Sequence, residues 1–135
     1  MTMQPAAIVF PDAELWATGR LRAALVGRPE AYAQGVYVSN SVPSTRRDRM
    51  VIVRRDGGAA SGLFDLPRLA VRCWAVTERD AADLTRLVAA LLWSMPGDGV
   101  CVRMQQLSGP SAIPDESNHY QRYSLFEARM RGSQL

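Results

Sequence analysis

The chain has 135 residues, a length typical of one domain with its own core. With 47% hydrophobic and 21% charged residues the composition is that of a globular protein, and no apolar run approaches the roughly 20 residues needed to span a bilayer. The net charge is +3 and all 16 basic residues are arginine, which excludes Schiff-base catalysis by lysine and the lysine of a phosphate-binding P-loop. No signal peptide is evident, so we expect one soluble intracellular domain over residues 1–135, with tails at 1–10 and 132–135.

The first predicted element is a helix from about Pro11 to Val26. Proline suits a first helical turn, and Asp12 and Glu14 place negative charge at the positive end of the helix dipole. Gly27 and the Arg-Pro that follows it then end the helix.

Two short β-like runs come next, at residues 36–38 and 50–53, both rich in β-branched residues. A polar, arginine-rich link over residues 39–48 separates them. The Asp-Gly-Gly sequence at 56–58 is a turn signal, and residues 59–62 are predicted to form a flexible loop.

The clearest strand covers residues 67–76. Its side chains alternate in character, which predicts one dry face and one mixed face. The dry face carries Leu69, Val71, Cys73 and Ala75, and the mixed face carries Arg68, Arg72 and Trp74.

The clearest helix follows directly, over residues 78–95. Thr77 can cap it, with Asp80 three residues later as in a capping box, and the Pro-Gly-Asp-Gly at 96–99 ends it. Its apolar stripe consists of Leu84, Leu87, Val88, Leu91, Leu92 and Met95. Trp93 falls on the opposite side with Ala82, Arg86 and Ala89, so it either forms a docking surface or is covered by the first helix.

Two strands close the chain, at residues 100–107 and 120–130, joined by a loop at 108–118 that contains glycine and proline. The order α-β-β-β-α-β-β predicts an α+β fold with a mixed, mostly antiparallel sheet and both helices on one face. The second helix acts as a crossover between two strands. Residues 39–49, 57–62 and 108–118 are expected to be mobile loops that become ordered against partners.

The chain offers little for catalysis or metal binding. Its single histidine, His119, could form a Ser-His-Asp group with Asp115, but no nucleophile elbow accompanies it. Cys73 and Cys101 are too few for a zinc site and are expected to be apolar side chains on strands, even neighbours in the sheet. We therefore expect no enzymatic activity, no metal and no cofactor.

Interaction surfaces are the alternative. The arginine-rich segment 46–55 could bind nucleic acid, although the nearly balanced charge and the lack of aromatic-basic interleaving favour a solvated or partner-facing loop. Candidate subunit or partner contacts are Arg68, Arg72, Trp74, Arg86, Ala89 and Trp93. Candidate loop contacts are Arg46, Arg47, Arg54, Arg55, Asp115 and His119.

Several local motifs together resemble the tail terminator proteins of long-tailed bacteriophages, especially those of phages that infect actinobacteria. They are the strand 67–75 running into helix 78–95, then Gly-Val-Cys-Val-Arg at 99–103, Ser-Gly-Pro at 108–110, Pro-Asp at 114–115, Arg-Tyr at 122–123 and Arg-Gly at 131–132. The likeness covers roughly residues 12–132. The exclusive use of arginine agrees with a GC-rich host.

The resemblance implies a structural virion protein without catalytic residues. Such proteins form a hexameric ring on the head-proximal end of the tail tube, stop its polymerisation and present a surface to the head connector. It also implies an α/β sandwich fold and partners among the tail tube and head-closure proteins. The protein would be located in the neck of the tail after assembly in the host cytoplasm. DNA would pass through the lumen of the ring, and no membrane contact is implied. Another phage neck protein (head-closure or adaptor), a nucleic-acid-binding module and a small enzyme with a subunit-interface active site remain alternatives.

Overall fold

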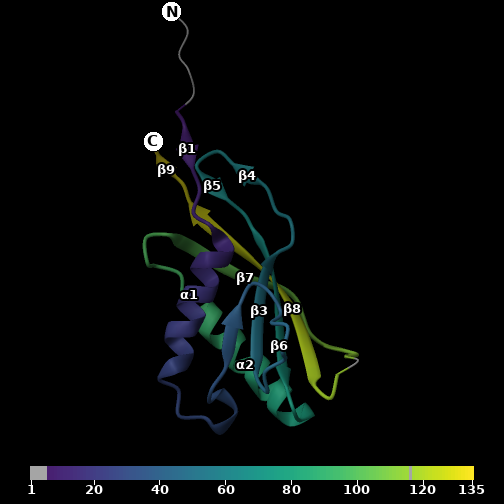
Figure 1. Ribbon diagram of the computed structural model, residues 1–135. Coiled ribbons are helices and arrows are strands. Elements are labelled where there is room, and N and C mark those ends of the chain that lie inside the picture. Colours follow the sequence, from purple (N-terminus) through teal and green to yellow (C-terminus); the bar gives the residue numbers. More distant parts are fainter. Residues whose placement is uncertain (1–5, 116) are drawn as a thin grey trace, which may run out of the picture.

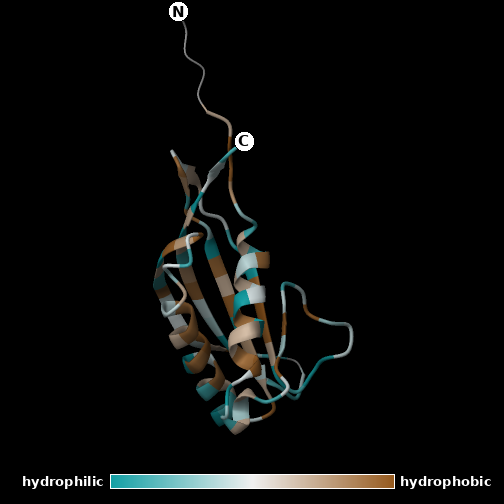
Figure 2. Ribbon diagram, turned by 90° about the vertical axis from the view of Figure 1, so that its left-hand side faces the viewer, coloured by the Kyte–Doolittle hydropathy of each residue, from teal (hydrophilic) through white to brown (hydrophobic). Residues whose placement is uncertain are grey.

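The computed structural model describes residues 6–115 and 117–135 and shows two helices on one side of a twisted β-sheet (Figures 1 and 2). The main elements, in chain order, are α1 (Ala13–Val26), β2 (Tyr37–Ser39), β3 (Met50–Arg55), β6 (Arg68–Ala75), α2 (Glu78–Trp93), β7 (Cys101–Ile113) and β8 (Tyr120–Arg131). Shorter elements are β1 (Ile8–Val9), the 3-10 turn η1 (Ala31–Ala33), β4 (Ala60–Ser61), β5 (Phe64–Asp65) and β9 (Ser133–Gln134). The predicted α+β class, the order of main elements and the position of both helices are confirmed.

The sheet has the strand order β2-β3-β6-β8, and β7 pairs with the other side of β8. The pair β2–β3 is parallel, whereas β3–β6, β6–β8, β7–β8 and β5–β8 are antiparallel. Because β6 and β7 both run antiparallel to β8, they are parallel to each other, and α2 connects them as the predicted crossover. The sheet is therefore mixed and mostly antiparallel.

The main core lies between the helices and the sheet. Alternate residues of β6 and β3 face the helices and are almost fully buried, including Leu69, Val71 and Val53. Leu21 of α1 and Leu84 of α2 are 0% exposed and meet them. Burying a leucine side chain stabilises a fold by roughly 1.5–3 kcal/mol, so this apolar layer is what holds both helices to one face.

Side-chain caps define where both helices begin. An oxygen of the Asp12 carboxylate accepts a hydrogen bond from the N–H of Leu15 at 3.0 Å, and the Thr77 hydroxyl accepts one from the N–H of Asp80 at 3.2 Å. Each such cap contributes about 1 kcal/mol. The predicted cap at Thr77 and the predicted end of the first helix at Gly27 are both confirmed.

The prediction that β7 ends near residue 107 was wrong. Residues 108–113 continue the strand and pair with β8, with register shifts on both sides of Ser108. Gly109 has φ 89°, and a Cβ added there would lie 2.5 Å from the Tyr123 carbonyl oxygen. The glycine that resembled a loop residue is thus the one that lets β7 pass close to β8.

Two further segments differ from expectation. The predicted flexible loop at 59–62 contributes to a short hairpin, in which β4 pairs with β5. Of the expected tails, residues 8–9 pair with residues 133–134 as strands β1 and β9, while residues 1–5 lie outside the described part of the chain. Figure 1 shows β1 and β9 projecting at the same end of the molecule as β4 and β5.

Candidate interaction surface

One face of the sheet carries no helix, and we call it the open face. It is formed by alternate side chains of β3, β6 and β8 that point away from α1 and α2. Its members are Met50, Ile52, Arg54, Arg68, Ala70, Arg72, Trp74, Gln121, Tyr123, Leu125, Glu127 and Arg129. Arg68 and Arg72 are exposed on this face, as the alternation of strand 67–76 predicts.

Trp74 differs from its two arginine neighbours because it is only 2% exposed. It packs with Met50 and Ile52 in a small second core on the open face. The guanidinium of Arg46, from the link between β2 and β3, lies over the indole at 5.7 Å from the ring centroid. Trp74 therefore anchors this link to the sheet and is not itself an exposed contact residue.

Arg46 also joins the β2–β3 link to the β7–β8 hairpin. Its guanidinium donates to a carboxylate oxygen of Asp115 at 2.9 Å, although the two residues are 69 positions apart. Burial by itself raises the pKa of Asp115, but the Ser117 hydroxyl, the charge of Arg46 and the nearby Trp74 indole outweigh it and lower the pKa below its ordinary value. Asp115 thus stays ionised at neutral pH and holds the link in place.

The structure also brings Asp115, Ser117 and His119 together. The Ser117 hydroxyl lies 2.7 Å from the Asp115 carboxylate and 3.0 Å from Nδ1 of His119. In a hydrolase triad the imidazole lies between the carboxylate and the hydroxyl, whereas here the hydroxyl lies between the other two. The carboxylate therefore does not orient the imidazole as a general base, and the three groups tie the hairpin tip together.

Arg54 and Arg72 border a hollow on the open face, which we call the arginine hollow. Arg54 pairs in register with Ala70, and Arg72 pairs with Ile52, so the two arginines are diagonal neighbours on adjacent strands. The cavity between them has a volume of about 340 Å³. It is lined by Val42, Ile52, Arg54, Arg55, Asp56, Ala70, Arg72 and Tyr123. The small side chain of Ala70 leaves the space open.

A second cavity continues from the arginine hollow, and we call it the Trp74 groove. Its volume is about 560 Å³, and it shares Val42, Arg72 and Tyr123 with the hollow. Its other lining residues are Arg46, Trp74, Ile113, Pro114, Asp115 and Gln121. The indole N–H of Trp74 is buried near the Asp115 carboxylate and makes no well-aligned hydrogen bond within residues 6–115 and 117–135. Because Arg72 lines both cavities, it lies where they meet.

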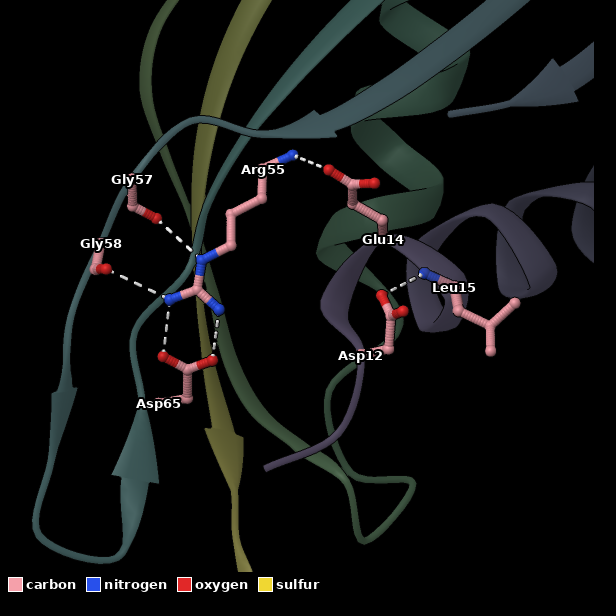
Figure 3. Close-up of polar contacts among 7 residues, drawn as sticks. All are labelled: Asp12, Glu14, Leu15, Arg55, Gly57, Gly58 and Asp65. Carbon is pink, nitrogen blue, oxygen red and sulfur yellow. Dashed lines mark hydrogen bonds and ion pairs between the residues drawn. The ribbon is translucent and has the colours of Figure 1, made fainter. Parts of the chain in front are cut away.

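The remaining candidate arginines have internal partners. Arg47 lies over the ring of Tyr37 at 5.4 Å from its centroid. The Arg55 guanidinium donates to both carboxylate oxygens of the buried Asp65, at 2.6 and 2.8 Å, and to the carbonyl oxygens of Gly57 and Gly58 (Figure 3). The structure thus places Arg55 as a clamp at the end of β3, with its side chain still 34% exposed.

The outward side of α2 forms a separate surface on the opposite side of the molecule from the open face. Trp93 is 52% exposed there, so α1 does not cover it, and this settles the alternative that the sequence left open. Arg86 on the same side pairs with Asp83. Ala89 is only half-buried and packs in part against the main core.

Sequence reasoning missed Val42, Ala70 and Tyr123 as parts of the surface. Ala70 alternates with Arg68 and Arg72 along the strand, so its place on the mixed face could have been found. Tyr123 becomes a neighbour of Arg72 only through the register of β8 against β6, which the sequence does not fix.

The two cysteines are buried, free thiols in the main core, as predicted, but they are not neighbours. Strand β8 separates them, because Cys73 pairs with Arg122 and Cys101 with Met130. Burial raises the pKa of Cys73 to about 12, which makes this thiol unreactive.

Within the described ranges, no group of three or more histidine, cysteine, aspartate or glutamate side chains is placed to hold a metal ion. Neither α1 nor α2 is long and apolar enough to cross a membrane, and no other helix in the described part of the chain is either.

Comparison with known proteins shows a likeness to a solved virion structure. No family model and no curated protein matches the chain. A solved structure described as the virion of the native gene transfer agent (GTA) particle contains a chain that superposes with a TM-score of 0.63 and 15% sequence identity. The match covers 89% of this chain and 98% of that one. At this identity the likeness shows that the two chains share a fold.

Proposed function

We propose that the chain is a structural virion protein that forms a closed ring at the head-proximal end of a phage tail tube. The ring ends polymerisation of the tube and offers a surface for joining the head. The observation that carries this proposal is the shared fold, over 98% of the other chain, with a component of a GTA virion. The resemblance of the sequence motifs to tail terminator proteins points to the same role.

The assembly we propose is a homo-hexamer in the neck of the virion, built in the host cytoplasm. Its partners are the tail tube protein on one side and a head-closure or connector protein on the other. The chain has no enzymatic activity of its own in this role. DNA passing through the lumen meets arginine side chains that contact phosphates without reading sequence.

The outward side of α2 offers a patch of the kind that a ring needs. A ring needs a heterologous contact, in which one patch of a subunit meets a different patch of the next. The outward side of α2 lies on the opposite side of the molecule from the open face, so it can serve as one of these patches while the open face stays free. Trp93 supplies an exposed aromatic anchor of the kind enriched at the centre of interfaces.

Deleting the coding region for this protein from the phage genome tests the role. We expect tails that are longer than normal and do not join heads, because nothing stops tube growth or presents a surface to the head. Tail length is measured by electron microscopy of the lysate, and supplying the protein in trans is the control that restores normal particles. Tails of normal length in the absence of the protein would contradict the proposal.

A further inference from the structure

The arginine hollow and the Trp74 groove together form a continuous binding site that the ring does not by itself account for. Arg54 and Arg72 take part in no ion pair within 4.0 Å among residues 6–115 and 117–135. Diagonal neighbours on adjacent strands lie about 7–8 Å apart at Cα. Two positive charges on neighbouring side chains that have no ion pair repel each other, and an anion between them would remove that repulsion.

The chemistry of the lining groups identifies the anion. A guanidinium matches a carboxylate because it can donate two parallel hydrogen bonds to it. The hollow is small, about 340 Å³, and the open space over Ala70 between the arginines is of a size that takes one side chain. The groove beyond it adds the Tyr123 ring and the side chains of Ile113 and Pro114, and Ile113 is 40% exposed. These are apolar surfaces for the residues that flank a carboxylate in an extended peptide.

Nucleic acid fits this site less well. Binding to a duplex depends on many simultaneous phosphate contacts, and the chain has a net charge of only +3. Three carboxylates also stand around the two cavities. Asp56 and Asp115 line them, and Glu127 lies further along the open face beside Arg68. These charges repel every phosphate of a duplex, so they disfavour a duplex more than a single carboxylate that enters between Arg54 and Arg72.

A second copy of this chain is also a poor source of the carboxylate. Eight of its acidic side chains already form ion pairs within their own chain. They are Glu30, Asp65, Glu78, Asp80, Asp83, Asp98, Asp115 and Glu127. Arginines outnumber acidic residues by 16 to 13 in the whole chain. Of the other described acidic residues, Asp12 and Glu14 accept hydrogen bonds within their own chain and Asp56 lines the hollow itself, which leaves Asp48. We therefore take the acidic partner to be a different protein.

We propose that the arginine hollow and the Trp74 groove bind an extended acidic segment of another protein, with one carboxylate seated between Arg54 and Arg72. The inference rests on the proposed function only in expecting that protein to be a component of the virion. Val42, 42% exposed at the junction of the two cavities, supplies an apolar contact for the residue next to the carboxylate.

The chain carries its own reporters for a binding experiment. Trp74 lines the groove, whereas Trp16 donates its indole N–H to Asp98 at 2.9 Å and Trp93 stands on α2. In a ¹⁵N–¹H spectrum of the labelled full chain at low ionic strength, we expect an octapeptide of alternating glutamate and serine to shift the Trp74 indole signal saturably. The other two indole signals should stay in place.

Three variants sharpen the test. Arg72→Gln removes one of the two charges, and Ala70→Leu fills the hollow without changing charge, so each should weaken binding at least ten-fold. Arg79→Gln is the matched control, because its side chain is 91% exposed on α2, away from the open face. Thermal melting of each variant verifies that it is folded. Binding that is equal in Arg72→Gln and wild type would overturn the proposal.

Other outcomes would overturn it as well. The same octapeptide with glutamine in place of glutamate should bind at least ten-fold more weakly, and equal binding would show that no carboxylate is recognised. A 16-base-pair duplex that shifts the Trp74 signal at lower concentration than the peptide would assign the site to nucleic acid. Loss of ring formation in Arg72→Gln would assign it to a second copy.

The result is separable from the test of the ring. If rings form and the peptide does not bind, the acidic partner is rejected and the proposed function stands. If the peptide binds and no ring forms, the proposed function is rejected and the acidic partner stands.

Discussion

At the scale of single residues, the clamp between Arg55 and Asp65 is a bidentate ion pair with one buried partner. Asp65 has a side chain that is 3% exposed, whereas that of Arg55 is 34% exposed. The hydrogen bonds that Arg55 donates to the Asp65 carboxylate raise the pKa of Arg55. The backbone N–H of Arg55 also donates to the carboxylate of Glu14 at 2.6 Å, so the clamp joins β3, the β4–β5 hairpin and the start of α1 (Figure 3).

Removing Arg55 and removing Asp65 should lower the free energy of unfolding by different amounts. Arg55→Ala leaves a buried carboxylate without its partner, and we expect it to lower the free energy of unfolding by about 3 kcal/mol. Asp65→Ala leaves a guanidinium that water can still reach, and we expect a loss of about 1–2 kcal/mol. Urea denaturation of both variants measures this difference. Arg54→Ala, on the other face of the same strand, is the control and should change stability by less than about 0.5 kcal/mol.

A loss in Asp65→Ala equal to or larger than that in Arg55→Ala would contradict this description of the clamp. The sequence alone suggested a different role for Arg55, because five arginines between residues 46 and 55 resemble an exposed basic patch. The structure separates them by strand alternation and by partners that are distant in the sequence. The arginine content of residues 46–55 therefore indicated a basic segment. It did not indicate which of these arginines have partners within the chain and which can contact another molecule.

At the scale of elements, Asp98 connects α1 to the turn between α2 and β7. Its carboxylate accepts hydrogen bonds from the Trp16 indole and from the backbone N–H groups of Val100 and Cys101, and Arg20 lies 3.6 Å away. Burial alone raises the pKa of Asp98, but these donors outweigh it and lower the pKa below its ordinary value. The ionised form is therefore the one that the folded state favours.

Because the pKa of Asp98 is lowered in the folded state, the stability that Asp98 contributes depends on pH. A carboxyl group whose folded pKa is lowered contributes stability above its unfolded pKa, near 4, and that contribution is lost as the pH falls through the folded pKa. We expect Asp98→Asn to lower the free energy of unfolding at pH 7 by about 1–2 kcal/mol. Denaturation curves recorded at several pH values should show that the difference in the free energy of unfolding between variant and wild type becomes smaller below pH 4.

Asp56→Asn is the matched control, because Asp56 is an exposed carboxylate with no ion pair to any described residue. It should leave the pH dependence unchanged. A gap between Asp98→Asn and wild type that stays constant down to pH 2 would show that Asp98 is not the group responsible.

Elements with strong periodicity were predictable from the sequence, and the continuation of β7 over residues 108–113 was not. The apolar spacing and caps of α2, and the alternation of β6, each favour one structure, so both were found close to their true bounds. Gly109 and Pro110 favour a turn locally, yet the pairing of residues 108–113 with β8 overrides that preference. Local signals fail where a long-range partner supplies the hydrogen bonds.

At the scale of the whole molecule, the candidate surface depends on contacts between distant parts of the chain. Arg46 meets Asp115 across 69 residues, and Arg72 meets Tyr123 only through the β6–β8 register. The sequence named Arg46, Arg72, Trp74 and Asp115 as candidates without placing them together, because register and loop position follow from packing of the complete fold. The exposure of Trp93 likewise needed the position of α1.

The ring makes a direct prediction about Trp93. If the outward side of α2 is a subunit contact, Trp93→Ala removes an exposed aromatic anchor and should weaken ring formation by at least ten-fold in protein concentration. Val26→Ala is the control, since Val26 is 85% exposed on α1, and it should assemble as wild type does. Equal assembly of Trp93→Ala and wild type would remove Trp93 from the contact.

Electron microscopy of the purified wild-type protein in negative stain tests the central claim most directly. A protein that closes through a heterologous contact should appear as uniform rings with a central opening, and the proposed hexamer should show six-fold symmetry in averaged images. Isolated small particles at every concentration examined, or open filaments of variable length, would contradict a closed ring.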